Sequence, residues 1–302
     1  MDHNLQQLDV SIGVIVYNEA GNILNLLNAL EEQNLSTVSI QEIIVVSSAC
    51  TDGTDDLVRE HMEDHPKVKL ITEPERRGKS SAINMFLQNA VSSICIIESG
   101  DTIPARDTVE KMISPFANPV IGMTGARPMP VNHEDNFIGY AVHLLWRLHH
   151  RMATISPKLG EMVAFRKLFN EIPKDSAVDE ASIEAMIRDR HKELKYIGDA
   201  MVYNKGPENL KDFIKQRRRI ETGHLWLKRM QNYTVASQKS DILMQILKEE
   251  IREYPSSIVR IFAVMFLEQY CRLLGKYDFY VKKRNPFTWD IAESTKNLNK
   301  GA

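Results

Sequence analysis

The sequence has few cysteines and no large excess of charge of either sign. Only three of the 302 residues are cysteines, and the spacing of Cys50, Cys95 and Cys271 excludes a disulfide framework or a cysteine-based zinc site. Two of them lie in or beside apolar segments, so we expect reduced, buried thiols in a cytoplasmic protein. The formal net charge of −2 gives no overall basic field. The composition therefore does not favour a nucleic-acid-binding protein.

Signals for secretion, membrane spanning and the commonest nucleotide-binding loops are also missing. The first ten residues have no apolar core, so they do not form a signal peptide. The apolar stretch 257–270 is interrupted by Arg260 and Glu268, and it is shorter than the roughly 20 residues that a transmembrane helix needs. No G-x-x-x-x-G-K-S/T motif occurs, which excludes a P-loop ATPase, and the absence of G-x-G-x-x-G after a strand argues against a Rossmann dinucleotide-binding domain.

The first hundred residues alternate short apolar runs with amphipathic segments. The apolar runs have the length of buried strands, and the segments between them carry apolar residues at helical spacing. The predicted strands cover 10–17, 42–48, 68–72 and 94–97, and the predicted helices cover 21–30, 54–64 and 79–91. This order predicts an α/β fold with a mostly parallel central sheet and helices on both faces.

The rest of the sequence is mixed at first and then almost entirely helical. We expect strands at 120–130 and 160–168, a strand pair at 195–206, and helices at 137–152 and 179–190. Helical patterns dominate after Gly206 and Pro207. We therefore divide the chain into a main domain, 1–230, and a C-terminal helical region, 231–302.

The stretch ICIIESGDTIP, residues 94–104, indicates a candidate cation site. Its apolar run ends abruptly at Glu98, which is followed by Ser99, Gly100 and Asp101. Open α/β folds bind their ligands at the carboxyl ends of the strands, and hard divalent cations prefer carboxylate oxygens. The simpler alternative is a polar turn that leaves the core.

Two segments before predicted helices have residues that suit a nucleotide. Tyr17, Asn18 and Glu19 follow the first strand, where a ring can stack on a base and polar groups can bond to it. Three cations surround the glycine of the segment PERRGKSSAIN, namely Arg76, Arg77 and Lys79. Cations beside free helix amides form a plausible diphosphate site. A helix cap and a solvated charged turn are the respective alternatives.

Two later segments carry charged residues that could act as a general base or bind an anion. Asp179 and Glu180 start a predicted helix, where acids usually complement the helix dipole; the functional alternative is a general base. The segment 212–230 contains Arg217, Arg218 and Arg219, followed by His224. Because consecutive residues of a helix point in different directions, at most two of these arginines can share one anion.

In their order along the chain, these segments resemble the family 2 glycosyltransferases. These enzymes have the GT-A fold and transfer a sugar from a nucleotide sugar with inversion at the anomeric carbon. The resemblance is carried by VIVYNEAGNI, IIVVSSACTDGTDD, RRGKSSAIN, ESGDTIP, GEMVAFR, DEASIE and QRRRI, which span about residues 10–224.

The resemblance implies a nucleotide pocket, a metal site and a catalytic base. The nucleotide would contact Tyr17, Asn18, Glu19, Ser48, Arg77, Lys79 and Gly100. The diphosphate or the acceptor would contact Gln216, Arg218, Arg219 and Glu161. Asp101 matches the second acid of the family's Asp-x-Asp motif and would bind Mn2+ or Mg2+, with His224 completing the metal shell. Glu180 would deprotonate the acceptor hydroxyl, with Asp179 beside it.

Three departures from the family pattern affect these expectations. Ser99 replaces the first acid of Asp-x-Asp, which weakens the metal site. Ser48 stands where the family commonly has an aspartate that contacts uracil, so it bears on the choice of nucleotide. Ile220 replaces the tryptophan of the processive synthases, which predicts transfer of one sugar per encounter.

These features predict a metal-dependent, inverting, non-processive glycosyltransferase of the hexosyltransferase type. A UDP-sugar is the favoured donor, and a glycan or a lipid-linked molecule is the expected acceptor. The alternative is a non-catalytic GT-A protein that binds a nucleotide or acts as a scaffold, since Ser99 removes one acid of the metal motif. A nucleotidylyltransferase is a remote third option, because its glycine-rich signature is missing.

The C-terminal region contains a predicted helix with a wide apolar face. Arg260, Glu268 and Arg272 share one narrow stripe, and most other residues of the segment are apolar. The protein's own core is the simplest cover for this face. The alternatives are a second copy in a homodimer and a membrane surface, where basic residues of 205–229 would meet anionic headgroups. Peripheral association with the inner face of a membrane is therefore one hypothesis.

Overall fold

The structure is a computed structural model that describes residues 7–238, 240–287, 293–295 and 298. One eight-stranded sheet runs through the molecule in the order β3-β2-β1-β4-β7-β6-β8-β5. Its strands are β1 (Leu8–Val16), β2 (Val38–Ser48), β3 (Val68–Glu73), β4 (Ile94–Ser99), β5 (Thr102–Pro104), β6 (Ile121–Pro130), β7 (Val163–Arg166) and β8 (Glu193–Asn204). The first four strands pair in parallel, β6 pairs in parallel with β8, and β7 runs antiparallel to both of its neighbours.

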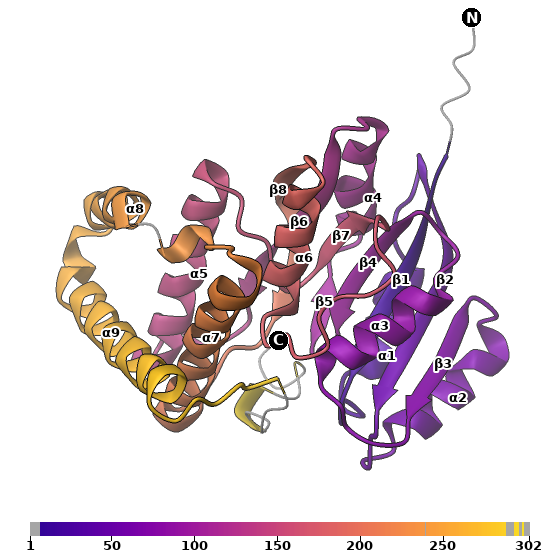
Figure 1. Cartoon of the computed structure of the whole chain (residues 1–302), viewed down its shortest axis with the longest axis horizontal. Helices are drawn as coiled ribbons and strands as arrows, with labels where there is room; N and C mark the ends of the chain where they lie inside the picture. The colour runs from indigo at the N-terminus through magenta and orange to yellow at the C-terminus, as the bar shows by residue number, and fades with distance from the viewer. Residues whose placement is uncertain (1–6, 239, 288–292, 296–297, 299–302) are drawn as a thin grey trace, which may run out of the picture.

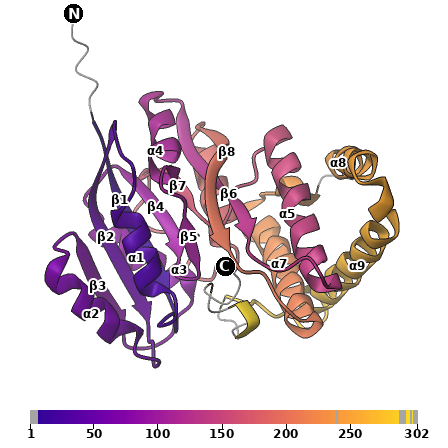
Figure 2. The ribbon, with the colours of Figure 1, turned by 180° about the vertical axis from the view of Figure 1, so that it is seen from behind.

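Helices cover both faces of the sheet and form a separate layer at one end. The α-helices are α1 (Ile23–Glu31), α2 (Thr54–Asp64), α3 (Lys79–Asn89), α4 (Thr108–Ile113), α5 (Phe137–Ile155), α6 (Asp179–Asp189), α7 (Leu210–Gln231), α8 (Ser240–Glu253) and α9 (Ile258–Tyr280). Short 3-10 turns occupy Ser114–Ala117, Ala236–Gln238, Pro255–Ser257 and Glu293–Thr295. Figures 1 and 2 show α5, α7, α8 and α9 together on one side, and α1, α2 and α3 around the first strands on the other.

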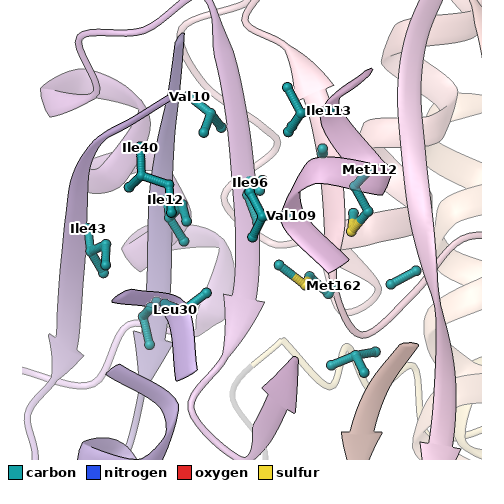
Figure 3. Packing of buried hydrophobic residues seen from close by; sticks show 14 of the residues in the cluster. Val10, Ile12, Leu30, Ile40, Ile43, Ile96, Val109, Met112, Ile113 and Met162 are labelled. Carbon is teal, nitrogen blue, oxygen red and sulfur yellow. The ribbon is translucent and has the colours of Figure 1, made fainter. Parts of the chain in front are cut away.

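The two faces of the sheet explain why its strands read as continuous apolar runs. Along β2, Ile43 and Val45 belong to the core on one face, whereas Ile44 and Val46 belong to the core on the other. Figure 3 shows part of the first core, in which Ile12 of β1 lies among residues of neighbouring elements. A strand that is buried on both faces cannot alternate apolar and polar residues.

The mostly parallel α/β fold predicted from the first hundred residues is confirmed. The expected strand pair at 195–206 is wrong, because one strand, β8, runs through Glu193–Asn204 with an irregular register against β6. Two short elements escaped prediction, the three-residue strand β5 and the six-residue helix α4. Both are too short to show a periodic pattern. The division at residue 230 stays a prediction; α7 ends at Gln231.

The carboxyl ends of β1, β2 and β4 meet at one edge of the sheet, at Val16, Ser48 and Ser99. Gly100 follows β4 there, and its backbone N–H donates to the carbonyl of Ile15 at 3.0 Å. A Cβ at Gly100 would lie 2.7 Å from a methyl group of Val16. The turn therefore needs glycine in order to bring the residue after it, Asp101, close to the ends of β1 and β4.

The helix α9 packs against α7 through charged residues as well as through buried apolar residues such as Ile261 and Val264, which share a core with Phe213 of α7. The Glu268 carboxylate accepts hydrogen bonds from Arg217 at 2.7 and 2.8 Å and from Arg272 at 3.0 Å, and Asp278 pairs with Arg218. Large apolar side chains on the opposite face remain exposed, namely Val259, Phe262, Phe266, Tyr270, Leu273, Tyr277 and Tyr280. Of the polar stripe predicted from the sequence, Glu268 and Arg272 thus lie on the α7 side, whereas Arg260 is exposed. The protein's own core covers Ile261, Val264 and Cys271 but leaves the face that carries Phe262 and Phe266 exposed.

A carboxylate of α4 fixes the loop that leads into β2. Glu110 accepts hydrogen bonds from the backbone N–H groups and the hydroxyls of Ser36 and Thr37 at 2.5–3.1 Å. Burial acts to raise the pKa of Glu110, but these hydrogen bonds outweigh it and lower the pKa to about 2. In an unfolded chain the pKa of a glutamate is about 4.3.

We predict that Glu110→Gln lowers the free energy of unfolding by about 2 kcal/mol at pH 7, the usual contribution of hydrogen bonds to a charged group. The depressed pKa makes this contribution complete above about pH 4.3, and it is lost as the pH falls towards 2. Urea unfolding at pH 7 and pH 2.5 measures the effect, with the exposed Glu60 changed to Gln as the matched control. A deficit as large at pH 2.5 as at pH 7 would contradict the prediction.

Candidate active site

Two adjoining cavities lie at the edge of the sheet where β1, β2 and β4 end. The first cavity has a volume of about 650 Å³ and lies between the loops after β1 and β4, the helix α7 and the segment 284–287. Seven of its lining side chains are lysines or arginines and three are acids. The basic residues are Arg76, Lys79, Lys211, Lys215, Arg218, Arg219 and Arg284; the acids are Glu19, Asp101 and Asp278. This surplus of positive charge suits a polyanionic ligand such as a diphosphate.

Five of the residues predicted to bind the nucleotide line the first cavity. They are Tyr17, Glu19, Ser48, Lys79 and Gly100. Arg77 and Asn18 do not line it. Arg77 is exposed beside Glu75 at 3.9 Å, and Asn18 instead accepts a hydrogen bond from the backbone N–H of Thr51 at 2.8 Å.

The arginine that does line the first cavity is Arg76, whose guanidinium lies 4.0 Å from the centre of the Tyr17 ring. The turn after Arg76 explains why this arginine, and not the neighbouring Arg77, lines the cavity. Gly78 has φ = 93°, a conformation that favours glycine, and it immediately precedes α3. The turn directs Arg76 towards Tyr17 and leaves Arg77 in solvent.

Ser48 is supported by a buried acid that sequence reasoning missed. Its hydroxyl donates to Glu73 at 2.7 Å, and Ser81 donates to the other carboxylate oxygen at 2.6 Å. Glu73 ends β3 and is buried. A carboxylate therefore stands directly behind the serine that replaces the family's aspartate.

The second cavity has a volume of about 300 Å³ and shares part of its wall with the first. Both are lined by Lys79, Asp101, Gln216, Arg219 and Thr295. The second cavity is also lined by Glu161, Asp179, Glu180 and His224. The structure thus brings together predicted residues from segments that lie more than a hundred residues apart.

An ion pair stands at the junction of the two cavities. The Lys79 ammonium donates to a carboxylate oxygen of Glu180 at 2.6 Å and to the Ser99 hydroxyl at 3.0 Å. Burial acts to raise the pKa of Glu180, but the charge and hydrogen bond of Lys79 outweigh it and lower the pKa. Burial and the neighbouring Glu180 charge raise the pKa of Asp179. The environment therefore keeps Glu180, rather than Asp179, as the ionised member of the pair.

Four acids and two basic residues line the second cavity around this ion pair, namely Asp101, Glu161, Asp179 and Glu180 with Lys79 and Arg219. Burial, followed by the charges of Asp101 and Glu180, raises the pKa of Glu161 to about 7. Glu161 also has φ = 60°, an uncommon conformation for a residue with a side chain. Across residues 7–238 and 240–287, the Asp101 carboxylate makes no hydrogen bond or ion pair. Asp101 can offer carboxylate oxygens, the preferred ligands of a divalent cation, but among the described residues no three acids of the junction have ligand atoms within 4.8 Å of one another.

Glu98 and His224 are less suitable as metal ligands than Asp101. Burial raises the pKa of Glu98 to about 8, and its carboxyl accepts a hydrogen bond from Thr102 at 2.9 Å. Burial, Lys158 and Arg217 lower the pKa of His224 well below its usual value. An imidazole surrounded by cations is poorly placed to bind another cation. The prediction that His224 completes a metal shell therefore receives no support from its surroundings.

Among the residues that the structure describes, one group of three His, Cys, Asp or Glu side chains has ligand atoms within 4.8 Å of one another. It consists of Glu31, His61 and His65. Both imidazoles bond to the Glu31 carboxylate at 2.8 Å. None of the three lines either cavity.

The arginines of α7 point in different directions, as expected from helix geometry. Arg219 lines both cavities, Arg218 lines the first and pairs with Asp278, and Arg217 lines the second and pairs with Glu268. Sequence reasoning named Arg76 in the basic run but assigned the nucleotide contact to Arg77, and it missed Lys158 and the C-terminal segment 284–287 as wall residues. Neither Lys158 nor the segment 284–287 belongs to a motif that could have indicated it.

Comparison with known proteins identifies the family. A family model described as Glycosyl transferase family 2 matches residues 11–189, more than half of the chain. The chain belongs to this family. The match contains the strand ends and loops that supply Tyr17, Lys79, Asp101 and Glu180, whereas α7, α8 and α9 lie outside it.

Relatives of this family and solved structures agree with the fold. Glycosyltransferase AglE of Haloferax volcanii is 28% identical over 116 residues, and the match spans 38% of the length of that relative. The mannosyltransferase PcManGT of Pyrobaculum calidifontis, solved with GDP-Man and Mn2+, has a TM-score of 0.57 and 23% identity, over 92% of this chain and 75% of that one. S. aureus TarS 1-349, solved in complex with UDP-GlcNAc, has a TM-score of 0.53 and 17% identity, over 90% of this chain and 80% of that one. The chain has the GT-A fold of these glycosyltransferases.

Proposed function

We propose that the protein transfers a sugar from a nucleotide sugar to an acceptor hydroxyl, with inversion and one sugar per encounter. The observation that carries this proposal is the meeting of two cavities of different character at Lys79, Asp101 and Arg219. The first cavity is basic and receives the donor, and the second receives the acceptor. In this arrangement residues 1–230 form the catalytic part, and 231–302 complete the walls of both cavities.

The donor site uses the charges of the first cavity. The base stacks near Tyr17 and Arg76, with Ser48 and Glu73 at its edge, and the diphosphate lies among the lysines and arginines of the wall. A UDP-sugar is the donor favoured by the family pattern, and Ser48 makes a GDP-sugar the alternative. PcManGT and TarS 1-349 were solved with donors of these two kinds, GDP-Man and UDP-GlcNAc.

Asp101, with Glu161 close by, would hold Mn2+ or Mg2+ at the junction. When bound, the ion stabilises negative charge on the diphosphate oxygens. Arg219 and Lys79 supply positive charge from the protein on the same side. Charge stabilisation of this kind, aimed at the leaving group, is commonly the largest single contribution to catalysis.

Glu180 acts as the general base. Its ionised carboxylate takes the proton from the acceptor hydroxyl, whose oxygen forms a bond to the anomeric carbon. The bond from that carbon to the diphosphate oxygen breaks, and its electron pair leaves with the nucleoside diphosphate. Lys79 holds Glu180 ionised and in place before the acceptor arrives.

We predict that both UDP and GDP bind only weakly without Mn2+, and that one of them binds at least tenfold more tightly with it. Arg76→Ala should weaken binding of that nucleotide by tenfold or more, because it removes the cation beside Tyr17. Arg77→Ala is the matched control and should change the affinity less than twofold. Calorimetric titration measures each affinity. Absence of binding in a folded sample would favour the non-catalytic scaffold instead.

For catalysis, Glu180→Gln should leave the nucleotide affinity within about twofold of wild type and reduce turnover by at least a hundredfold, the usual contribution of a general base. Asp179→Asn should be much less harmful to turnover. Hydrolysis and transfer assays with a panel of nucleotide sugars measure the rates. Full activity of Glu180→Gln together with inactivity of Asp179→Asn would move the base to the neighbouring residue.

We also propose that the protein works at an anionic membrane surface, on the cytoplasmic side where its three free cysteines stay reduced. No helix within the described ranges is long and apolar enough to cross a membrane. The exposed apolar face of α9 is instead flanked only by basic charge. Over residues 258–287 the exposed charged side chains are Arg260, Lys276, Lys282, Lys283 and Arg284, while Glu268 and Asp278 are buried in ion pairs. Apolar and aromatic side chains with basic neighbours are typical of interfacial helices.

The double variant Phe262→Ser/Phe266→Ser should reduce co-sedimentation with vesicles containing phosphatidylglycerol by at least fivefold, because these rings insert into the interface. Val91→Ser/Val120→Ser, which changes two exposed apolar residues far along the chain from α9, should bind like wild type. A dimer in solution that the α9 variant disrupts, with no vesicle binding by wild type, would assign the face to a second copy.

A further inference from the structure

The cluster of Glu31, His61 and His65 lies at the carboxyl ends of two neighbouring helices. Glu31 is the last residue of α1, His61 lies in the last turn of α2, and His65 follows that helix directly. The two helices contact each other on the same face of the sheet, where Leu30 and Val58 share a core. The cluster is therefore part of the contact between α1 and α2.

The three side chains direct their ligand atoms to one place. Nε2 of His61 and Nδ1 of His65 each lie 2.8 Å from a different oxygen of the Glu31 carboxylate. The two imidazole rings are stacked, with centroids 3.9 Å apart and an angle of 1° between their planes. The spacing of four residues explains the stacking, because residues i and i+4 lie on the same face of a helix. Two histidines at this spacing can bind one zinc ion together.

The distances in the cluster suit a tetrahedral metal ion. Zn2+ binds imidazole nitrogens and carboxylate oxygens at about 2.0–2.2 Å, so the ligand atoms of a tetrahedral site lie roughly 3.3 Å apart. The two contacts of 2.8 Å therefore need to open by only about half an ångström. Two histidines and one glutamate form a ligand set that Zn2+ uses with a water molecule in the fourth position.

The cluster is partly buried and still accessible to solvent. The exposed fraction of the side chain is 9% for His61, 22% for Glu31 and 39% for His65. Burial of His61 restricts the motion of its ring, so one ligand is held in place before an ion arrives. The exposure of His65 lets an ion enter from solvent and lets water reach the fourth position.

The surroundings of the cluster favour a cation. Both helices end here, and the carboxyl end of a helix carries a partial negative charge. The cation nearest to His61 in the sequence is Arg59, which pairs with Asp56 at 2.7 Å. His61 and His65 differ in this respect from His224, which lies among cations. Three exposed acids lie within three residues of His61, namely Glu60, Glu63 and Asp64.

We propose that Glu31, His61 and His65 bind one Zn2+ ion, which joins the carboxyl end of α1 to that of α2. Imidazole ligands suit zinc, whereas Mg2+ and Mn2+ suit ligand sets of carboxylates, carbonyls and water. This site therefore selects a different ion from the one proposed at Asp101, and it does not depend on the transfer reaction.

The ion completes a connection that hydrogen bonds make at the other ends of the same helices. Before α1 begins, the backbone N–H of Glu19 donates to the Thr54 hydroxyl at 2.9 Å and that of Ala20 donates to Asp52 at 3.0 Å. Thr54 is the first residue of α2. With the ion bound, α1 and α2 are joined at both ends, and the loop that carries Tyr17 rests on a more stable pair of helices.

Calorimetric titration of the untagged chain with Zn2+ tests the proposal. Wild type should bind one Zn2+ that neither Mg2+ nor Mn2+ displaces, and His65→Gln should weaken its binding at least tenfold, because two ligands remain. His133→Gln changes an exposed histidine outside the cluster; it is the matched control and should bind Zn2+ like wild type. Zn2+ at a hundredfold excess over its dissociation constant should raise the Tm of wild type by about 5 °C.

Further variants show where the ion binds. Glu31→Gln tests the third ligand and should also weaken Zn2+ binding. Asp101→Asn should keep this site, and Co2+ bound to it should show the strong visible absorption of a four-coordinate ion. Loss of that Zn2+ from Asp101→Asn, with retention by His65→Gln, would place the ion at the junction of the cavities and overturn the proposal. Equal Zn2+ affinity of wild type and His65→Gln, or no Zn2+ binding by folded wild type, would overturn it too.

Discussion

The ion pair between Lys79 and Glu180 is the interaction on which the rest of the site depends. It joins the first residue of α3 to the first turn of α6, two helices that pack against different parts of the sheet. Burying a carboxylate costs several kcal/mol unless an opposite charge meets it at short distance. Lys79 supplies that charge and also bonds to Ser99 at the end of β4. The acids of the junction can therefore lie close together because α3 begins there with a lysine and α7 adds Arg219.

The arrangement of the first strands was predictable because burial on both faces leaves a strong signal. Apolar runs such as 94–97 are too regular to be loops, and the polar residues after them had to lie at one edge of a parallel sheet. The positions of Asp101, Lys79 and Glu180 at a shared junction follow from that geometry together with the family pattern. The same reasoning could not choose between Arg76 and Arg77, because the choice depends on the backbone of Gly78.

The C-terminal half was less predictable, since its contacts are set by packing rather than by local pattern. The apolar segment of α9 indicated a buried helix, yet only part of its apolar surface is buried. Glu268 and Asp278 are buried as well, because Arg217 and Arg218 of α7 offer them partners. Lys158 belongs to no motif. Its place in the second cavity depends on a loop between α5 and β7 whose conformation no periodicity encodes.

The walls of the first cavity come from segments that lie more than 250 residues apart in the chain. Tyr17 lies on one wall, while Arg284 and Phe287 lie on another. Two hydrogen bonds hold the segment 284–287 at this wall. Trp226 donates to the Arg284 carbonyl at 2.7 Å, and Asn285 donates to the Asp175 carbonyl at 3.0 Å. During synthesis the eight strands can therefore emerge and pair before the wall of the first cavity is complete, because that wall needs residues 284–287.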